Sequence, residues 1–380
     1  MGERFTAKQL EVKTATPDAH YYEYQDVEYD YGQIGTFPLP GMRGIERFLP
    51  LLPVEKIAVE LPGKVGDTPL QQARNLGQAV GLTNLWIKHE ETNPTGCLKD
   101  RESVVVISAA IEKGFDKVYV ISSGNAALST AAYANKAGIH CTCYVPEKTS
   151  QGKQDLMHLY GADIITISGF YEDVYRKVVD MNPPGWNVTS GQNALRIEGA
   201  KTVAYELFEQ LGTVPDVVVV PSGNGGALAG IWKGFIELQK LGKITKLPQM
   251  VSVQIKDAAP FSVAMATGQD FAVLGEIEDS IAEGIVAQES YCSPKAMAAL
   301  RESGGYVVEV TDDEIKAALK TVIQLESFVP EPTSAAVYAA LPKLHVDSNT
   351  LIVAINTGSG MKMLDEVVEA TKEVKVWGAQ

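Results

Sequence analysis

The regular alternation of short apolar runs with helical stretches is the feature that most constrains the fold of this chain. In the first half, apolar runs over 117–122, 140–145, 163–168 and 185–188 are separated by stretches with helical periodicity. Strands that alternate with helices form parallel sheets with helices on both faces. The pattern therefore predicts an α/β unit that binds its ligands at the carboxyl ends of the strands.

A second series of the same kind occupies the C-terminal half. Its strands are expected over 217–220, 250–255, 306–310 and 350–356. One helix is expected to run from 197 to 211, and the region from 256 to 292 shows no clear period. The second half therefore predicts another α/β unit.

The length of the chain, 380 residues, is sufficient for two domains. We expect two three-layer α/β domains with mostly parallel sheets and no flexible linker. The expected bounds are 1–60 for an N-terminal extension, 61–98 plus 190–380 for a large domain, and 99–189 for a smaller, mobile domain. The tyrosines of the extension are expected to pack on the body of the protein or on a partner subunit; they are Tyr21, Tyr22, Tyr24, Tyr29 and Tyr31.

Composition excludes several classes of function. A formal net charge of −14 would repel nucleic acids and anionic membranes, so neither is expected as a partner. The four cysteines form neither a disulfide framework nor paired zinc ligands, and the histidines are scattered, so no metal site is expected. The first residues are polar and no apolar run approaches the length of a membrane span, which predicts a cytoplasmic protein.

Lys99 occupies an unusual position for a lysine. Asn93, Pro94 and Gly96 indicate a turn, and the apolar run over 103–111 indicates a helix, so Lys99 is expected at a helix start. The positive end of the helix dipole disfavours an ammonium there, and a neutral lysine amine is the nucleophile that forms a Schiff base with an aldehyde. The alternative is a solvated lysine in an exposed turn.

The segment Ser222, Gly223, Asn224, Gly225 and Gly226 follows the strand at 217–220 and opens a helix. Glycines let the backbone approach a ligand, and the N–H groups of a helix start bind phosphate. The spacing matches neither the dinucleotide fingerprint nor a P-loop. The alternative is a glycine-rich turn needed only for tight packing.

Two further polar turns lie at expected strand ends. Ser122, Ser123 and Asn125 open a helix after the strand at 117–122, where hydroxyls and amides suit a carboxylate, or where they serve only as a helix cap. Thr357 belongs to a small hydroxyl-bearing turn after the last strand. An amine, a phosphate cradle and a hydroxyl turn at strand ends are together what pyridoxal 5'-phosphate requires.

The sequence resembles the fold-type II pyridoxal-phosphate enzymes, whose fold is that of the tryptophan synthase beta subunit, and within them threonine synthase. The likeness covers most of the chain between 66 and 362. Its matches are Gly66-Asp67-Thr68-Pro69-Leu70, Asn93-Pro94-Thr95-Gly96, Lys99-Asp100-Arg101, Ser123-Gly124-Asn125, Arg196-Ile197-Glu198-Gly199, Lys201-Thr202, Gly223 to Gly226, Trp232-Lys233-Gly234, Glu331-Pro332-Thr333-Ser334-Ala335-Ala336 and Thr357-Gly358.

The resemblance implies a role for each cofactor residue. Lys99 would carry pyridoxal 5'-phosphate as a Schiff base and then shuttle protons. Asn125 would bind its 3-oxygen, the segment from Ser222 to Gly226 its phosphate, and Thr357 would face the pyridine nitrogen. Because a hydroxyl does not keep that nitrogen protonated as an aspartate would, the cofactor would suit elimination and replacement more than transamination.

The resemblance also implies a lyase or synthase of amino-acid metabolism that acts on a small, phosphorylated amino acid as a homodimer. In the family's reaction, O-phosphohomoserine and water give threonine and phosphate. Ser122 and Ser123 would bind the substrate carboxylate. The substrate phosphate would lie near Thr189, Ser190 and Arg196, because an arginine fork suits a dianion.

The chain departs from the threonine synthase pattern near the lysine. Cys97 and Leu98 stand where the family has Ser-Phe, Glu102 stands where Gly or Pro follows the arginine, and Ala126 replaces a threonine. Two other activities therefore stay open, an O-phosphoserine-dependent synthase of the cysteate synthase kind and a serine or threonine ammonia-lyase. A non-catalytic sensor that binds pyridoxal phosphate is the alternative from another class.

Overall fold

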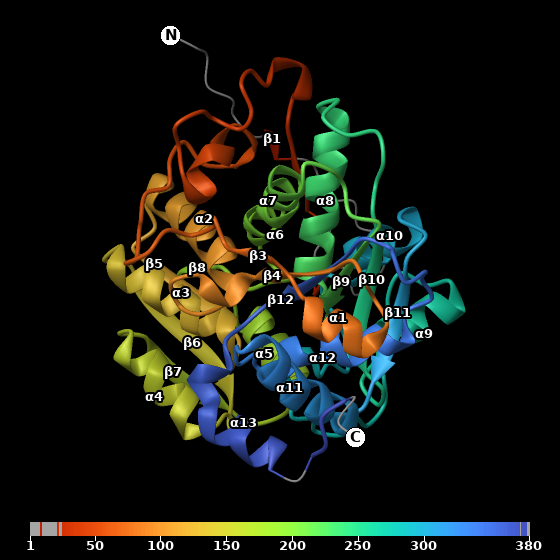
Figure 1. Cartoon of the computed structure of the whole chain (residues 1–380). Helices are drawn as coiled ribbons and strands as arrows, with labels where there is room; N and C mark the ends of the chain where they lie inside the picture. The colour runs from red at the N-terminus through yellow and green to blue at the C-terminus, as the bar shows by residue number, and fades with distance from the viewer. Residues whose placement is uncertain (1–7, 10–20, 23–24, 373, 378–380) are drawn as a thin grey trace. The chain divides into compact units, whose positions relative to one another are not determined.

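The computed structural model describes residues 8–9, 21–22, 25–372 and 374–377, and Figure 1 shows its helices and strands. The described residues fall into two compact units. Unit 1 comprises those within Met1–Asp67, Asn93–Thr95 and Lys99–Thr202, and unit 2 those within Thr68–Thr92, Gly96–Leu98 and Val203–Gln380. Each unit is an α/β structure with its own sheet, which confirms the predicted fold class.

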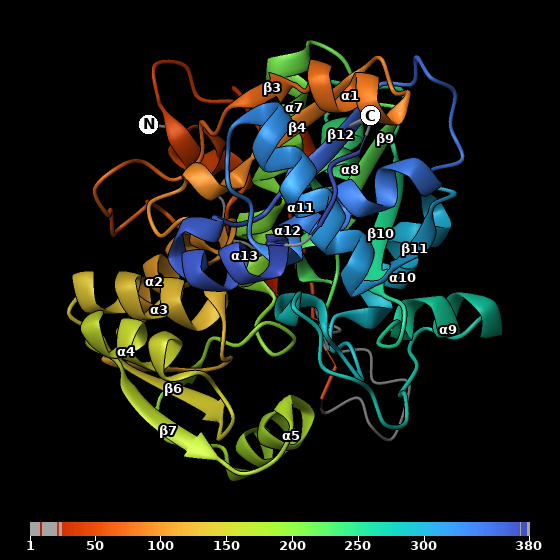
Figure 2. The same ribbon diagram turned by 60° about the horizontal axis from the view of Figure 1, so that its bottom comes forward.

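Unit 1 is built on a four-stranded parallel sheet in the order β7-β6-β5-β8. The strands are β5 (Lys117–Ile121), β6 (His140–Pro146), β7 (Asp163–Ile167) and β8 (Trp186–Asn187). The helices are α2 (Lys99–Glu112), α3 (Asn125–Lys136), α4 (Gln151–Leu159), α5 (Tyr171–Met181) and α6 (Leu195–Ala200). Figure 2 shows α3 and α4 on one face of this sheet and α5 on the other, as expected for a parallel sheet.

The alternating burial of the strands explains this packing. Val118, Val120 and Cys143 face the helices α2 and α3, with which they form one apolar cluster. Tyr119 and Tyr144, at the intervening positions of β5 and β6, contact each other edge to face. Successive side chains of a strand point to opposite faces, so both faces of the sheet are buried at β5 and β6.

The N-terminal extension belongs to unit 1 in the part that the structure describes. A small antiparallel pair joins β1 (Lys8–Gln9) to β2 (Val27–Glu28), and 3-10 turns follow at Tyr31–Gln33 and Gly44–Leu51. Tyr22 and Tyr29 are buried, which confirms the prediction that such tyrosines pack on the body of the protein. Tyr24 lies outside the described residues.

Unit 2 is built on a six-stranded sheet in the order β11-β10-β9-β12-β4-β3, in which only the edge strand β3 is antiparallel. The strands are β3 (Leu70–Gln72), β4 (Leu85–His89), β9 (Val217–Pro221), β10 (Gln249–Ile255), β11 (Tyr306–Val310) and β12 (Ile352–Asn356). The helices are α1 (Arg74–Val80), α7 (Thr202–Leu211), α8 (Gly226–Lys240), α9 (Pro260–Thr267), α10 (Ser293–Glu302), α11 (Asp312–Glu326), α12 (Pro332–Ala340) and α13 (Leu364–Thr371).

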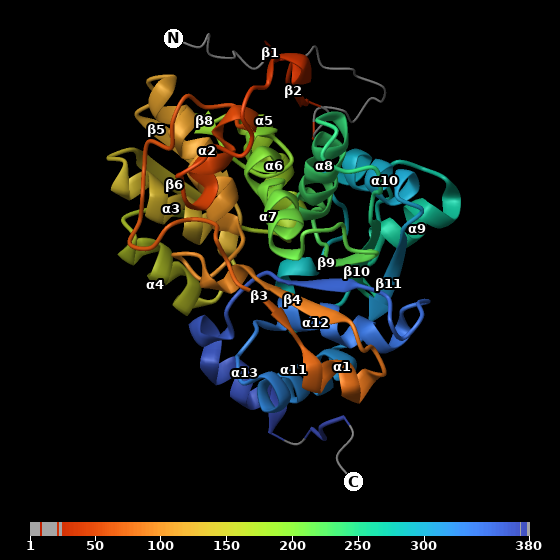
Figure 3. The same cartoon turned by 45° about the horizontal axis from the view of Figure 1, so that its top comes forward.

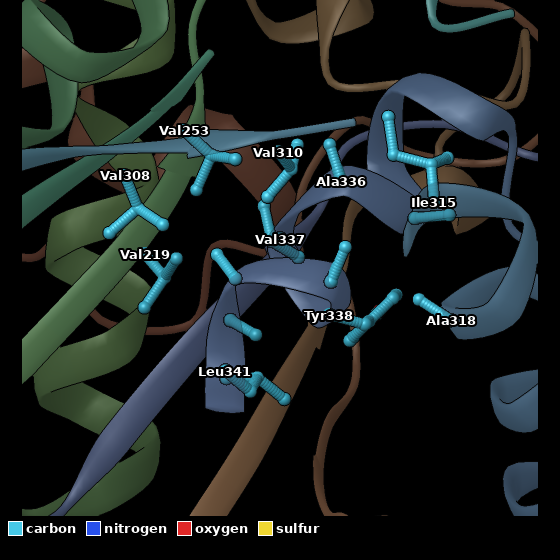
Figure 4. Close-up of a cluster of buried hydrophobic side chains, with 14 of the residues drawn as sticks. Val219, Val253, Val308, Val310, Ile315, Ala318, Ala336, Val337, Tyr338 and Leu341 are labelled. Carbon is cyan, nitrogen blue, oxygen red and sulfur yellow. The ribbon is translucent and has the colours of Figure 1, made fainter. Parts of the chain in front are cut away.

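Helices cover both faces of this sheet too. Figure 3 shows α7 and α8 on one face and α11 and α12 on the other. Figure 4 shows the cluster under α12, where Val219, Val253 and Val310 of the strands meet Val337 and Tyr338. Burial of this apolar surface is the main favourable contribution to the folding of the unit.

Three details differ from the sequence prediction. The expected helix over 197–211 is two helices, α6 and α7, with Lys201 as the C-cap of the first. The strand β3 was not expected, because three residues carry no periodicity and its pairing depends on β4. Likewise α9 lies in the region without a clear period, because it is apolar on every side.

The division into units also differs from the expected domain bounds. Unit 1 takes in the extension and continues to Thr202, beyond residue 189. The reason is a tight contact between α6 and α2, because a Cβ on Gly199 would lie 1.9 Å from the carbonyl oxygen of Arg101. The mobility expected of the smaller domain stays a prediction.

Within the described residues, no helix is long and apolar enough to cross a membrane.

Candidate active site

Lys99 is the first residue of α2, as the sequence predicts. Its Nζ donates to Oε1 of Glu102 at 2.5 Å, and its side chain is 27% exposed. The alternative of a solvated, exposed turn is wrong, because Asp100 and Arg101 are completely buried. Lys99 is thus a partly accessible amine on a segment that is otherwise inside unit 1.

The two charged residues after Lys99 anchor the start of the helix. Asp100 accepts hydrogen bonds from the N–H of Thr95 at 2.6 Å and from the hydroxyls of Thr95 and Ser129 at 2.5 and 2.6 Å. Arg101 donates to the hydroxyl of Thr202 at 3.0 Å. A carboxylate in the first turn also interacts favourably with the helix dipole. These bonds fix the first turn of α2, and with it the backbone of Lys99.

Glu102 connects Lys99 to Arg196. Its second oxygen, Oε2, lies 3.6 Å from Nη1 of Arg196, and both side chains are 1% exposed. Nη2 of Arg196 donates to the Thr130 hydroxyl at 2.6 Å, and Nε donates to the Val188 carbonyl. Burial lowers the pKa of the Arg196 guanidinium, and the charge of Glu102 opposes this effect.

Arg196 is therefore buried and already contacts other groups of the protein. A substrate phosphate would have to reach a guanidinium that is 1% exposed and whose Nε and Nη2 donate to Val188 and Thr130, whereas Nη1 makes no hydrogen bond to a described residue. Binding of a substrate phosphate by Arg196 stays a prediction.

The order of strands in unit 1 brings the predicted substrate residues to one edge. From β5 the chain proceeds to β6 and β7 on one side and then returns to β8 on the other side of β5. Ligands of such sheets bind where the strand order reverses, at the carboxyl ends. Ser122 and Ser123 follow β5, and Thr189 and Ser190 come shortly after β8.

Hydrogen bonds hold this edge together. The Thr189 hydroxyl accepts from the N–H of Ile121 at 3.0 Å, and the Ser122 hydroxyl accepts from the N–H of Gly124 at 3.2 Å. Gly124 is the N-cap of α3, so no side chain caps the helix that begins at Asn125. The alternative that the two serines serve only as a helix cap is therefore wrong.

The strand order of unit 2 reverses between β9 and β12, and the predicted cofactor segments follow these two strands. Gly225 is the N-cap of α8 with a φ of +87°, a left-handed conformation that favours glycine. A Cβ on Gly223 would lie 2.8 Å from the carbonyl oxygen of Gly284. The alternative of tight packing thus holds for these glycines, and it is compatible with a phosphate cradle at the helix start.

The loop before α8 is fixed from the side. The side-chain oxygen of Asn224 accepts from the N–H groups of Tyr291 and Cys292 at 2.6 and 3.2 Å. The hydroxyl of Ser290 donates to the carbonyl of Gly223 at 2.5 Å. The conformation of the loop is therefore set by the chain itself.

Thr357 lies in a turn that Ser334 supports. The hydroxyls of Ser334 and Thr357 are 2.8 Å apart, and Ser334 accepts from the N–H of Gly358 at 2.8 Å. A Cβ on Gly358 would lie 2.2 Å from Oε1 of Glu331. The N–H of Leu98, the residue before Lys99 in the chain, donates to the Thr357 carbonyl at 2.8 Å.

Two residues of this arrangement were not singled out from the sequence. Ser334 belongs to a run that matches the family, but its contact with Thr357 depends on the fold. Glu102 was noted only as a departure from the pattern, and its pairing with Arg196 spans 94 positions. A buried charge three residues from the expected nucleophile is the signal that could have found it.

The residues present fit pyridoxal 5'-phosphate. The aldehyde requires an accessible amine, which Lys99 has; the phosphate requires backbone N–H groups at a helix start, which α8 offers. The pyridine nitrogen requires a hydrogen-bonding group, which the hydroxyl of Thr357 can be. Among the described residues no group of three or more His, Cys, Asp or Glu side chains is arranged to hold a metal ion.

Comparison with known proteins places the chain in a family. The model of the pyridoxal-phosphate dependent enzymes matches residues 61–358. The threonine synthase of Methanocaldococcus jannaschii is 36% identical over 337 residues, which cover 87% of this chain and 83% of that protein. The threonine synthase of Methanosarcina acetivorans is 34% identical over 365 residues, which cover 93% and 88%.

Solved structures share the fold. Threonine deaminase isoform 2 from Solanum lycopersicum superposes with a TM-score of 0.67 at 22% identity, covering 80% of this chain and 83% of that one. A fungal L-serine ammonia-lyase from Rhizomucor miehei superposes with a TM-score of 0.70 at 20% identity, covering 81% and 98%.

Proposed function

Because the chain belongs to the family of pyridoxal-phosphate-dependent enzymes, with pyridoxal 5'-phosphate as its cofactor, we propose that it catalyses elimination or replacement on a small amino acid. The leading reaction is that of a threonine synthase, in which O-phosphohomoserine and water give threonine and phosphate. It is supported by 34 to 36% identity to threonine synthases over most of the chain. The observation that carries the proposal is the partly accessible amine of Lys99 at the start of α2.

Each predicted residue has a task in this proposal. Lys99 holds the cofactor covalently and moves a proton at the substrate. The N–H groups at the start of α8 bind the cofactor phosphate, and Asn125 binds the 3-oxygen. When bound, the cofactor supplies an electron sink for the bond-breaking step.

Thr357 determines how strong that electron sink is. The Ser334 hydroxyl accepts from the N–H of Gly358, and its own hydrogen can go to the Thr357 hydroxyl at 2.8 Å or to the Gly358 carbonyl at 3.3 Å. When Ser334 donates to Thr357, the hydrogen of Thr357 is available to the pyridine nitrogen. A neutral hydroxyl leaves this nitrogen unprotonated, which favours elimination over transamination.

A second candidate is an ammonia-lyase that acts on unphosphorylated serine or threonine. The observation in its favour is the buried position of Arg196, whose guanidinium donates to Thr130 and Val188 and lies 3.6 Å from Glu102. No exposed arginine fork for a phosphate dianion is then needed. An O-phosphoserine-dependent synthase remains the third reading, since Cys97 and Leu98 depart from the threonine synthase pattern.

One experiment separates these activities. The purified enzyme is incubated with O-phosphohomoserine, O-phosphoserine, threonine and serine, and the release of phosphate and of keto acid is followed. Phosphate and threonine from O-phosphohomoserine are expected. Phosphate from O-phosphoserine alone, or keto acid from serine and threonine alone, would replace the leading reaction by one of the alternatives.

The sensor alternative makes a different prediction for the same assay. A non-catalytic sensor would bind the cofactor and release no product from any of the four amino acids. The variant K99A serves as the blank for each reaction.

The homodimer and the cytoplasmic location are also part of the proposal. Mass measurement by light scattering during gel filtration tests the first, with an expected value of twice the chain mass. Cell fractionation tests the second.

A further inference from the structure

Glu102 touches the nitrogen that holds the cofactor in the proposed function. It lies three residues after Lys99, on the same side of α2, and accepts from Nζ at 2.5 Å. The carboxylate is 1% exposed and the lysine side chain 27% exposed. The acid therefore lies on the protein side of the amine, while part of the lysine stays accessible.

A third group orients the acid. Arg196 approaches the other oxygen of Glu102 to 3.6 Å, and Val188 and Thr130 hold the guanidinium in place. A nucleophile within hydrogen-bond reach of a base, with the base oriented by another group, is the arrangement that activates nucleophiles in enzymes. Lys99, Glu102 and Arg196 have this arrangement.

Glu102 could be present only to balance the buried charge of Arg196, but this does not explain its full position. Charge balance requires only a carboxylate near the guanidinium, and Oε2 already lies there. The other oxygen, Oε1, is directed to Lys99. One buried carboxylate therefore contacts two cations, and the contact with Lys99 calls for a separate explanation.

We propose that Glu102 is the proton acceptor that makes the Lys99 amine nucleophilic when it attaches to the aldehyde of pyridoxal 5'-phosphate; this inference rests on the proposed role of Lys99. Glu102 takes one proton from the Lys99 ammonium, and the freed lone pair forms the bond to the aldehyde carbon. A second proton of the nitrogen moves to the aldehyde oxygen, and Glu102 returns the first one as that oxygen leaves as water. No net proton and no electrons are exchanged.

The charged and titratable groups around Glu102 are few. Lys99 lies on its own helix and Arg196 on α6, and Cys141 of β6 and Tyr171 of α5 lie near Arg196. Asp100 faces the Ser129 hydroxyl of α3. Among these groups, Lys99 and Glu102 are the two that take part in the proposed proton transfer.

The test measures attachment and needs no turnover. Cofactor is removed with hydroxylamine, pyridoxal 5'-phosphate is added in saturating amounts, and the visible absorbance of the lysine adduct is followed by stopped flow from about pH 7 to 10.5. E102Q, which keeps the shape and removes the charge, is expected to attach about 10²-fold more slowly near neutral pH. The gap should narrow as the pH rises, because hydroxide in the solvent then competes with Glu102 as the proton acceptor.

Two further variants separate this role from a structural one. E198Q removes another buried carboxylate of unit 1 that is paired with a lysine, and it should attach at the wild-type rate. E102Q/R196Q restores the balance of buried charge and should stay slow. Reduction with borohydride followed by peptide mass analysis verifies that the adduct is on Lys99.

The outcomes distinguish this inference from the proposed function. If the wild-type protein forms no adduct on Lys99, the proposed role of Lys99 fails and the inference with it. If the wild type forms the adduct and E102Q matches it in rate and pH profile, only the role of Glu102 is overturned. Recovery of the wild-type rate in E102Q/R196Q would overturn it too, because the effect would then come from the unbalanced Arg196.

Discussion

Unit 1 contains two lysine–glutamate pairs with the same spacing and opposite order. Lys99 precedes Glu102 at the start of α2, whereas Glu198 precedes Lys201 at the end of α6, and each pair has an N–O distance of 2.5 Å. The order in α6 agrees with the helix dipole, because Lys201 is the C-cap, and the order in α2 opposes it.

Exposure separates the two pairs further. The Lys201 side chain is 0% exposed and its amine lies over the ring of Tyr29, whereas the Lys99 side chain is 27% exposed. A lysine held against the helix dipole and left accessible suits chemistry, and a lysine held with the dipole and enclosed suits stability. The same two residue types thus serve different ends according to order and burial.

The largest expected effect is that of K99A. Removal of the amine abolishes covalent attachment, so that dialysis removes the cofactor and the visible absorbance with it. The matched control K201M removes the lysine of the other i,i+3 pair with glutamate, and it should keep the adduct on Lys99. Borohydride-stable adduct in K99A would mean that another lysine is the attachment site.

Next in size is the effect of E198Q on stability. Breaking a buried ion pair leaves Lys201 buried without its carboxylate partner Glu198, so the free energy of unfolding should fall by about 3–5 kcal/mol. Urea denaturation followed by circular dichroism measures this loss. A loss below about 1 kcal/mol would mean that the pair in α6 contributes no more to stability than an exposed ion pair. The assignment of a stabilising role to the α6 pair would then be wrong.

A smaller effect is expected from Y29F. The Tyr29 hydroxyl donates to Oε2 of Glu198 at 2.7 Å, and a hydrogen bond to a charged group contributes about 1.5–3 kcal/mol. The same denaturation measurement should show a loss in this range, with an unchanged rate of cofactor attachment. A slower attachment in Y29F would connect the extension to the chemistry and weaken the division of tasks.

The smallest effect is expected for K343A in unit 2, where Lys343 and Glu314 are 2.6 Å apart but 38% and 37% exposed. Burial by itself would raise the pKa of Glu314, but the bonds from Lys343 and Thr311 lower it overall. Stability from a lowered carboxyl pKa is present above the unfolded value, about 4.3, and is lost as the pH falls through the folded value.

K343A should therefore cost less than about 1 kcal/mol at pH 7, and nothing once Glu314 is protonated in acid. Denaturation midpoints at pH 7 and pH 3 measure both values. A larger loss at pH 3 than at pH 7 would contradict the sign of this dependence.

The strands and the site turns could be predicted from the sequence for one physical reason. Buried parallel strands such as β9 are continuous apolar runs, and the turns after them need glycine and hydroxyl residues in short sequence windows. Lys99 at the start of α2 follows from local turn and helix signals in the same way. These features depend on neighbours in the chain, which the sequence displays directly.

The features that escaped prediction depend on distant partners. The arginine fork of Arg196 suggested a phosphate ligand, and only the fold reveals that Glu102, Thr130 and Val188 surround it. The break at Lys201 between α6 and α7 and the close approach of Gly199 to α2 are likewise not signalled by any local pattern. Residue type suggested a ligand for Arg196, and only tertiary packing shows which groups of the protein contact it.

The reversal of strand order in each sheet has a consequence for remodelling the chain. Every predicted site segment that follows a reversal, such as the loop before α8, lies at a carboxyl edge. The opposite edge of the unit 2 sheet carries the connection over 241–248, where Gly242 and Lys243 are exposed. Insertions are tolerated best at such exposed connections. The protein can therefore be lengthened there, for a tag or a fused domain, without altering the residues that we propose as cofactor ligands.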